Sequence, residues 1–471
     1  MNYSAADPKF VADLAALLPP DSLRNPEPRY LEESRGRFLG GGGVLALPRS
    51  VDEVSIIMRT CHAAGVPVVP YGGGTGLVGG QIMPGHAQPV ILSLERMSAI
   101  RSINGASNVI VAEAGCILAD VQAAADAEGR LFPLSLAAQG TARIGGNLST
   151  NAGGLNVLRY GNARDLCLGL EVVLPNGEIW HGLSELRKDN TGYDLKNLMI
   201  GAEGTLGVIT AASLKLFSKP VAHETAFLVV PDPEAAIGLL ALARAQLGEA
   251  VSAFELIHSR SLEFLSEAFP DLRQPFEERP EWSVLMEVGL SKALVGQDVL
   301  EVLFGEALER ELVTDGVVAS SEGQRQAFWS LRETIPAANK IVGSISSHDV
   351  SIPIERIPAF IEKGTQAVAA FEGLRVNCFG HLGDGNLHFN VFPPAGENKS
   401  DYSHLQSEVK VAVHDVVHEF GGSFSAEHGV GRLKVDDLAR YGDPVKLAMM
   451  RAIKNTIDPK GIMNPGAMFS N

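Results

Sequence analysis

Residues 70–80 read Pro70-Tyr71-Gly72-Gly73-Gly74-Thr75-Gly76-Leu77-Val78-Gly79-Gly80, with six glycines in the last nine positions. They follow an apolar run over 66–69 that predicts a buried strand. Glycines in such a loop let backbone N–H groups turn toward a phosphate without side chains in the way. A mobile surface loop would have the same composition, so the stretch alone leaves both interpretations open.

The surroundings of this loop exclude two common nucleotide-binding motifs. A Rossmann fingerprint requires a helix directly after the loop, whereas Met83-Pro84-Gly85 and a predicted strand over 90–94 follow here. A P-loop requires Gly-Lys-Ser or Gly-Lys-Thr, which this loop lacks. The loop is therefore a candidate phosphate site on another fold.

Short strands and helices alternate on both sides of the loop. Ser50 and Glu53 form a capping box that opens a predicted helix over 51–64, which Gly65 ends. The other elements predicted before Pro220 are a helix around 10–18, strands over 109–113 and 207–210, a helix over 118–128, and a hairpin of 171–174 with 178–180.

From Pro220 onward the sequence predicts an α+β half built on an antiparallel sheet. Its predicted elements are strands over 226–230 and 282–288, and helices over 233–247, 293–312, 407–421 and 445–457.

Two further glycine-containing stretches occur downstream of the loop. Pro133-Leu134-Ser135 precedes Ile144-Gly145-Gly146-Asn147-Leu148-Ser149-Thr150-Asn151-Ala152-Gly153-Gly154, and Ile200-Gly201-Ala202-Glu203-Gly204-Thr205-Leu206-Gly207-Val208-Ile209-Thr210 comes last. With 70–80 they resemble the PCMH-type FAD-binding domain of the vanillyl-alcohol-oxidase superfamily. The resemblance implies an α+β fold: this domain, then an α+β substrate or cap domain with an antiparallel sheet and a C-terminal helical segment.

The resemblance also implies which residues hold FAD, with backbone of Gly73 to Gly76 on the pyrophosphate. The implied cofactor contacts are Pro70, Gly72, Gly73, Gly74, Thr75, Gly76, Leu77, Gly80, Pro133, Ser135, Gly145, Gly146, Asn147, Thr150, Asn151, Gly153, Gly154, Glu203, Gly204, Ile209 and Asn464. Some relatives attach FAD through a histidine of the first loop. This loop has none, so we expect noncovalent FAD.

A second motif, Gly380-His381-Leu382-Gly383-Asp384-Gly385-Asn386-Leu387-His388-Phe389-Asn390, predicts a hairpin of strands 376–382 and 387–392. A two-residue Asp-Gly turn would place His381 directly opposite His388, with Cβ atoms about 5 Å apart. Asn390 would share the face of His388. Two such imidazoles can share one metal ion, and Glu427 in Ser425-Ala426-Glu427-His428-Gly429 offers a third ligand. The alternative is a pair of hydrogen-bonded structural histidines.

These motifs resemble the C-terminal domain of FAD-linked oxidases, the group of D-lactate dehydrogenases, D-2-hydroxyglutarate dehydrogenases and the catalytic glycolate oxidase subunit. The resemblance implies that His381, His388 and Glu427 bind a metal, Asn390 contacts substrate, His428 is the catalytic base and Asn464 reaches the flavin. The implied domains are an N-terminal helical extension over 1–39, the FAD-binding domain over 40–218 and the substrate and metal domain over 219–471.

The implied reaction is oxidation of a D-2-hydroxy acid to the 2-oxo acid. The acid would chelate the ion, which lowers the pKa of the hydroxyl group. His428 would remove the proton, and hydride would pass to flavin N5. Zinc is the expected ion, although two histidines and one glutamate also suit iron or manganese.

Arg332, in Phe328-Trp329-Ser330-Leu331-Arg332-Glu333, is a candidate clamp for the substrate carboxylate. An ion pair on a helix surface is the alternative interpretation. Relatives that act on hydroxyglutarate tend to carry Thr four residues after this Arg, and Lys before the following strand. This chain has Pro336 and Ser347 there, which leaves lactate, hydroxyglutarate and larger acids open.

Composition limits the other functions that the chain could have. A net charge of −16 argues against nucleic acid as a partner. Cys61, Cys116, Cys167 and Cys378 form no C-x-x-C pair and are typical of a reducing compartment. No signal peptide or membrane span is predicted, so we expect a cytoplasmic protein. A homodimer is the default assembly, and the electron acceptor could be an electron-transferring flavoprotein, a quinone or a cytochrome.

Three alternative functions remain to be distinguished. A non-haem iron oxygenase would use the two histidines and Glu427 without flavin. A non-redox flavoenzyme of the alkylglycerone-phosphate-synthase type would bind FAD but would not be reduced by hydroxy acids. A non-catalytic flavin-binding subunit of a larger complex should lack the metal ligands, whereas His381, His388, Glu427 and His428 are all present here. A subunit of the glycolate oxidase type would keep them and act within a complex.

Overall fold

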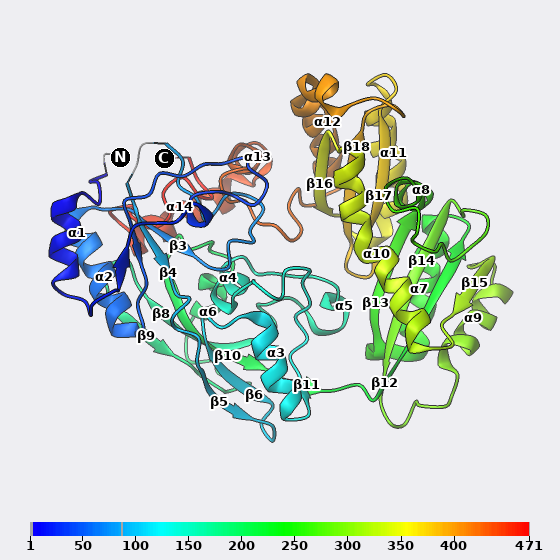
Figure 1. Ribbon diagram of the computed structural model, residues 1–471. Helices are drawn as coiled ribbons and strands as arrows, with labels where there is room; N and C mark the ends of the chain where they lie inside the picture. Colours follow the sequence, from blue (N-terminus) through cyan, green and yellow to red (C-terminus); the bar gives the residue numbers. More distant parts are fainter. Residues whose placement is uncertain (1–2, 86–87, 471) are drawn as a thin grey trace. The chain divides into compact units, whose positions relative to one another are not determined.

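The chain folds into two compact units, each with its own apolar core (Figure 1). The computed structural model describes residues 3–85 and 88–470. The first unit takes in the described residues of 1–154, 160–219 and 427–471, and the second takes in 155–159 and 220–426. The last segment of the chain thus belongs to the first unit, whereas the sequence predicts one domain over 219–471.

Two larger sheets and one two-stranded sheet form the first unit. The four-stranded sheet has the order β1 (Leu23–Arg24), β2 (Val44–Ala46), β4 (Val90–Ser93), β3 (Val68–Tyr71), with β2, β4 and β3 parallel. The antiparallel five-stranded sheet has the order β5 (Ile100–Asn104), β6 (Val109–Glu113), β10 (Val208–Lys215), β8 (Cys167–Val173), β9 (Ile179–Gly182). The remaining pair is β7 (Arg130–Leu131) with β11 (Phe217–Ser218). The helices are α1 (Pro8–Ala15), α2 (Val51–Ala64), α3 (Leu118–Ala127), α4 (Ile144–Ser149), α6 (Leu195–Met199), α13 (Val435–Tyr441) and α14 (Pro444–Ile457). Helix α5 (Val157–Tyr160) belongs to the second unit up to Arg159.

Helix α2 shows how local sequence sets an element. Ser50 Oγ accepts the N–H of Glu53 at 3.2 Å, and Gly65 closes the helix in the left-handed conformation at φ 69°. Its buried face includes Val54, Ile57 and Met58, which recur at helical spacing. The bounds predicted for this helix are confirmed.

The closing segment of the chain belongs to the first unit because it extends the β3 edge. Val68 and Met463 form a parallel bridge, Val68 N–H donates to the Ile462 carbonyl at 2.8 Å, and Asn464 N–H donates to the Val68 carbonyl at 2.8 Å. These bonds place the end of the chain beside the strand that carries the glycine loop.

The second unit is a seven-stranded antiparallel sheet between two helical layers. The strand order is β15 (Asp315–Val318), β12 (Ala222–Val230), β14 (Trp282–Leu290), β13 (Val251–His258), β17 (Arg375–His381), β18 (Asn386–Phe392), β16 (Ser346–Ser351). One face packs against α7 (Pro233–Leu247), α9 (Val299–Glu309), α11 (Ile357–Ala369) and α12 (Gln406–Glu419), and the other packs against α8 (Ser259–Ala268) and α10 (Glu322–Val342). The predicted antiparallel α+β architecture is confirmed.

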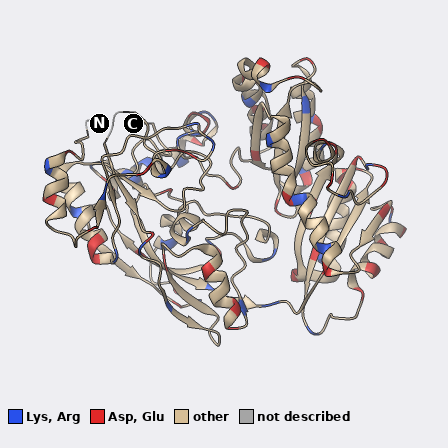
Figure 2. Cartoon of the chain, in the orientation of Figure 1, with Lys and Arg blue, Asp and Glu red and all other residues tan. Residues whose placement is uncertain are grey.

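Charged side chains of both signs are interspersed along both units (Figure 2). In the described part of the chain, none of the helices combines the length and apolar character that a membrane span requires.

Candidate active site

The glycine loop meets the second predicted flavin stretch backbone to backbone. A Cβ atom on Gly73 would lie 2.2 Å from the carbonyl oxygen of Thr141, and one on Gly72 would lie 3.2 Å from the Cα atom of Gly146. The contact at Gly73 permits only glycine, and the one at Gly72 is tight for any side chain. The third stretch joins them, because a Cβ atom on Gly204 would lie 2.9 Å from Cγ of Pro70.

Within this arrangement, Asn147 offers a polar atom for a ligand. Its Oδ1 atom is buried and has no hydrogen-bond partner among the described residues. Such an atom costs free energy unless something satisfies it. Ser135 lies against the end of the second stretch, since a Cβ atom on Gly154 would lie 1.9 Å from the Ser135 carbonyl oxygen. Close backbone and an unsatisfied buried oxygen fit the FAD that the motifs imply.

A hydrogen-bond network ties the glycine loop to the end of the chain. Arg432 donates from Nη1 to the carbonyl oxygens of Gly79 and Gly80, at 3.0 and 3.1 Å, and from Nη2 to Asn464 Oδ1 at 2.9 Å. Asn464 Nδ2 in turn donates to the carbonyls of Gly80 and Glu203, at 2.8 and 2.9 Å. The side chain of Asn464 therefore holds two of the predicted flavin stretches together.

Glu203 holds the loop that carries the predicted catalytic base. Its two carboxylate oxygens accept the N–H groups of Val430 and Gly431, at 2.7 and 2.6 Å, just after His428. Burial raises the pKa of Glu203, while these hydrogen bonds favour its charged form. Glu203 thus positions the 428–431 loop, in addition to its predicted place beside the cofactor.

The histidine hairpin has a different register from the predicted one. His388 lies opposite Phe379, and His381 lies opposite Glu255 of the neighbouring strand β13. The connection is a 3-10 turn over Leu382–Asp384 closed by Gly385 at φ 82°, not a two-residue turn. The prediction that His381 faces His388 directly is therefore wrong by two residues.

A shift of two residues leaves both imidazoles on one face, because side chains alternate along a strand with a period of two. The ring centroids of His381 and His388 lie 5.5 Å apart. Asn390 lies on the same face, opposite Asn377 and Ser347. The two histidines are thus close together on one face, as predicted, although the strand register differs from the predicted one.

The donor atoms of His381, His388 and Glu427 lie within 4.8 Å of one another. Glu427 follows Ala426, whose N–H donates to the Asp349 carbonyl of β16 at 3.3 Å. The Oε1 atom of Glu427 accepts the N–H of Gly154 at 2.8 Å. Two imidazoles and one carboxylate are a donor set that suits zinc, iron or manganese.

Arg332 lies inside the second unit and is 4% exposed. Its Nε atom donates to Glu255 Oε2 at 2.6 Å, and its guanidinium lies 4.9 Å from the ring centroid of Phe379. Its Nη2 atom is buried and has no hydrogen-bond partner among the described residues. The interpretation as an exposed helix-surface ion pair is thereby excluded, and one donor remains for a ligand.

Glu255 lies between Arg332 and His381. Its Oε1 atom is 2.6 Å from His381 Nδ1. Burial alone would raise the pKa of Glu255, but the charge of Arg332 and the hydrogen bonds from His381 and Arg332 lower it to about 2. The carboxylate is therefore ionised at neutral pH.

Sequence reasoning missed Glu255 and Arg432. Glu255 stands in the apolar stretch Val251–His258, for which no strand was predicted, and a carboxylate in such a run is a usable signal of a buried partner. Arg432 has no such signal, because its partners Gly79, Gly80 and Asn464 are distant in sequence.

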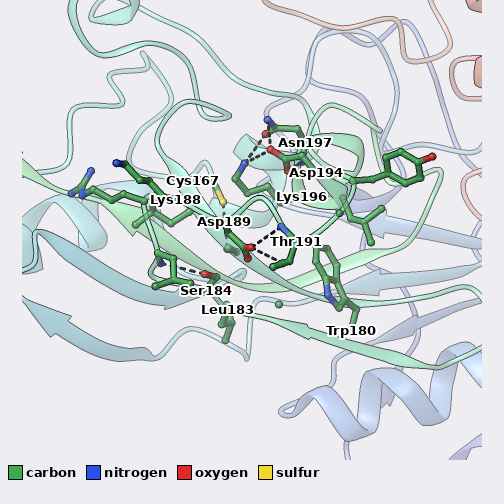
Figure 3. Close-up of a pocket in the computed structure, with 18 of the residues that line it drawn as sticks. Cys167, Trp180, Leu183, Ser184, Lys188, Asp189, Thr191, Asp194, Lys196 and Asn197 are labelled. Atoms are coloured by element: carbon green, nitrogen blue, oxygen red, sulfur yellow. Dashed lines mark hydrogen bonds and ion pairs between the residues drawn. The ribbon is translucent and has the colours of Figure 1, made fainter.

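A separate hollow in the first unit lies over β8 and β9 and is lined by Ser184, Lys188, Asp189 and Thr191 of the loop after β9 and by Lys196 of α6 (Figure 3). None of the predicted flavin, metal or substrate residues lines it. Asp189 accepts hydrogen bonds from Thr191, and Asp194 accepts one from Lys196. These carboxylates in the wall of the hollow are thus already hydrogen-bonded by neighbouring residues.

Comparison with known proteins identifies the family of the chain. Residues 219–468 match the family described as FAD linked oxidases, C-terminal domain, and residues 43–182 match the family described as FAD binding domain. The chain belongs to the FAD-linked oxidases. The resemblance stated from the motifs is confirmed.

This FAD-linked oxidase is 39% identical over 450 residues to the mitochondrial D-2-hydroxyglutarate dehydrogenase of Bos taurus, which covers 96% of this chain and 80% of that one. It is 37% identical to the mitochondrial D-2-hydroxyglutarate dehydrogenase of Arabidopsis thaliana, over 92% and 77% of the two chains. The D-2-hydroxyglutarate–pyruvate transhydrogenase of Saccharomyces cerevisiae is 32% identical, over 98% and 95%.

Solved structures share the fold at low identity. p-Cresol methylhydroxylase matches with a TM-score of 0.75 and 16% identity, over 98% of this chain and 96% of that one. Alkyldihydroxyacetonephosphate synthase matches with a TM-score of 0.71 and 18% identity, over 99% and 86%. These matches confirm the predicted fold class.

Proposed function

We propose that this FAD-linked oxidase oxidises the hydroxyl group of a D-2-hydroxy acid to the 2-oxo acid. The observation that carries the proposal is its identity of 37–39%, over most of the chain, with proteins named D-2-hydroxyglutarate dehydrogenase. The group formed by His381, His388 and Glu427 adds a chemical reason, because a 2-hydroxy acid is a natural chelator of a cation held by three protein ligands.

FAD, when bound, supplies the two-electron acceptor, and a divalent ion on the three ligands would supply Lewis acidity toward the hydroxyl group. The proposed role of His428 is to accept the hydroxyl proton, since an imidazole accepts protons near neutral pH. Glu203 fixes the loop in which His428 stands through the N–H groups of Val430 and Gly431. Asn390 would orient the acid from the face that it shares with His388.

Arg332 would bind the carboxylate of the acid through Nη2, the donor that Glu255 leaves unused. A charge-assisted hydrogen bond of this kind is stronger than a neutral one and orients the anion. On α10, Pro336 follows one turn later and is exposed, and Ser347 of β16 lies opposite Asn390. Neither side chain carries a positive charge that would select an acid with a second carboxylate. The test below therefore compares acids with and without that group.

The test is anaerobic flavin reduction with D- and L-lactate, D- and L-2-hydroxyglutarate and glycolate. The proposal predicts loss of the visible flavin absorbance with a D-acid and none with its L-enantiomer. The ratio of kcat/KM between D-2-hydroxyglutarate and D-lactate reports recognition of a second carboxylate. No reduction by any D-acid would contradict the proposal, and preferential reduction by L-acids would contradict its stereochemistry.

A further inference from the structure

Glu255 and His381 face each other across the β13–β17 strand pair. The register places them directly opposite, and Glu255 Oε1 lies 2.6 Å from His381 Nδ1. Both side chains are buried, with Glu255 at 1% and His381 at 7% exposure. Adjacent strands of a sheet hold this contact, so its geometry is fixed by backbone pairing and not by a flexible loop.

This contact decides which imidazole nitrogen can bind a cation. The carboxylate of Glu255 accepts the Nε–H of Arg332 with one oxygen and meets His381 Nδ1 with the other, so Nδ1 is the nitrogen that donates in this contact. The ring nitrogen of His381 that can offer a lone pair to a cation is then Nε2. A hydrogen bond of this kind also fixes the orientation of the ring, which in metal sites raises the affinity of the histidine for its ion.

The second carboxylate oxygen of Glu255 binds Arg332. Oε2 accepts from Arg332 Nε at 2.6 Å, while the Phe379 ring lies against the guanidinium. The guanidinium is thereby held in one orientation, with Nη2 buried and without a hydrogen-bond partner among the described residues. One carboxylate thus fixes both a candidate metal ligand and a candidate substrate ligand.

We propose that Glu255 is a positioning residue that presents His381 Nε2 to the metal ion and Arg332 Nη2 to the substrate carboxylate. The inference rests on the proposed function and deepens it, because it couples ion binding to acid binding through one side chain. Glu255 itself would contact neither the ion nor the acid.

Glu255→Gln tests the proposal, because an amide has one acceptor oxygen and cannot serve His381 and Arg332 together. The readout is the affinity of the purified FAD-loaded protein for Zn²⁺ and for Mn²⁺, measured by equilibrium dialysis against a competing chelator. We expect affinity to fall about 10- to 100-fold, as for other residues that orient metal ligands. The KM for the substrate acid should rise as well, because Arg332 loses its anchor.

Glu287→Gln is the matched control. Glu287 lies on the same face of the sheet and binds the same helix, α10, through Arg325 Nε at 2.8 Å and Trp329 Nε1 at 2.7 Å. It shares with Glu255 a buried position and an arginine partner, but neither Arg325 nor Trp329 is a candidate ligand. Its replacement should leave ion affinity within about twofold of the wild type, since His381 keeps its partner.

Glu255→Asp is a second variant for the case in which the glutamine variant does not fold. It keeps two acceptor oxygens, but its side chain is shorter by one methylene, so both oxygens lie farther from His381 and Arg332. It should show an intermediate loss of ion affinity. If the wild type binds the ion and a folded Glu255 variant binds it with the same affinity, the role of Glu255 is rejected while the proposed function stands. A wild-type protein that oxidises a D-acid without binding either ion would overturn the metal part of the proposed function, and with it this inference.

Discussion

Gly73 is the residue at which a single methyl group should prevent cofactor binding. Its Cβ atom would overlap the Thr141 carbonyl oxygen at 2.2 Å, which forces the glycine loop away from the second flavin stretch. We expect Gly73→Ala to be purified largely without FAD, as measured by the ratio of flavin to protein absorbance. Gly140→Ala is the control, because a Cβ atom there would meet nothing within 4 Å. Equal FAD content in the two variants would show that the loop does not hold the cofactor.

His388 should be required for turnover and dispensable for FAD. It lies on β18 of the second unit, whereas the predicted flavin contacts lie in the first. His388→Ala should abolish flavin reduction by the D-acid, a loss of at least about 10³-fold if the ion is essential, while the bound FAD spectrum is unchanged. Turnover within tenfold of the wild type would reject the metal site as part of the mechanism.

The histidine hairpin shows what a sequence can and cannot predict about an element. Alternation along strands over 376–382 and 387–392 correctly placed both imidazoles on one face, since that depends only on a period of two. The Asp-Gly signal gave the wrong register, because Leu382–Asp384 forms a 3-10 turn before Gly385. Glu255 could not be predicted from local pattern, because its pairing with His381 depends on β13 lying next to β17.

Helix α10 is docked on the sheet by polar contacts at helical spacing. Arg325 and Trp329 bind Glu287, Arg332 binds Glu255, and Asn339 Oδ1 accepts from Asn377 at 3.0 Å. These positions are four, three and seven residues apart, a spacing that keeps them on one side of the helix. Charge pairing on α10 thus complements the apolar contacts of Phe328, Leu331 and Ile335.

This docking should make stability depend on acid pH. Burial alone would raise the pKa of Glu287, but the hydrogen bond from His223, the charge of Arg325 and the Trp329 N–H lower it to about 2. The unfolded value is about 4.3, so the stabilisation is complete above that pH and is lost as pH falls toward 2. In urea unfolding, Glu287→Gln should be less stable than the wild type by about 2–3 kcal/mol at neutral pH.

The difference in unfolding free energy between wild type and Glu287→Gln should shrink progressively below about pH 4. A difference that is constant between neutral and acid pH would show that Glu287 acts through packing and not through its charge.

The division of the molecule into two units could be anticipated only in part. The change in pattern near Pro220 and the motifs of each half were visible in the sequence. The return of Glu427–Asn471 to the first unit was not, because it depends on the pairing of Met463 with Val68 and on the contacts of Arg432 and Asn464. Contacts between such distant segments leave no periodic trace.

Because each unit has its own core, the chain should unfold in two steps, and FAD should shift only one of them. Trp180 lies in the first unit, whereas Trp282 and Trp329 lie in the second. In Trp180→Phe, tryptophan fluorescence reports the second unit, and flavin fluorescence reports the first. Added FAD should raise the urea midpoint of the flavin signal, since a ligand stabilises what it binds. A single shared midpoint that moves with FAD would show that the units unfold together.

The bridge between Val68 and Met463 also sets the order of events during biosynthesis. The ribosome makes the glycine loop early, but its clamps Arg432 and Asn464 only after the whole second unit has emerged. Apart from Leu155–Arg159, the second unit is one continuous stretch from Pro220 to Ala426. It can therefore fold before the ribosome has made the segment 427–471 that completes the first unit. We therefore expect the complete set of contacts around the glycine loop to form only on the finished chain, because Arg432 and Asn464 are made last.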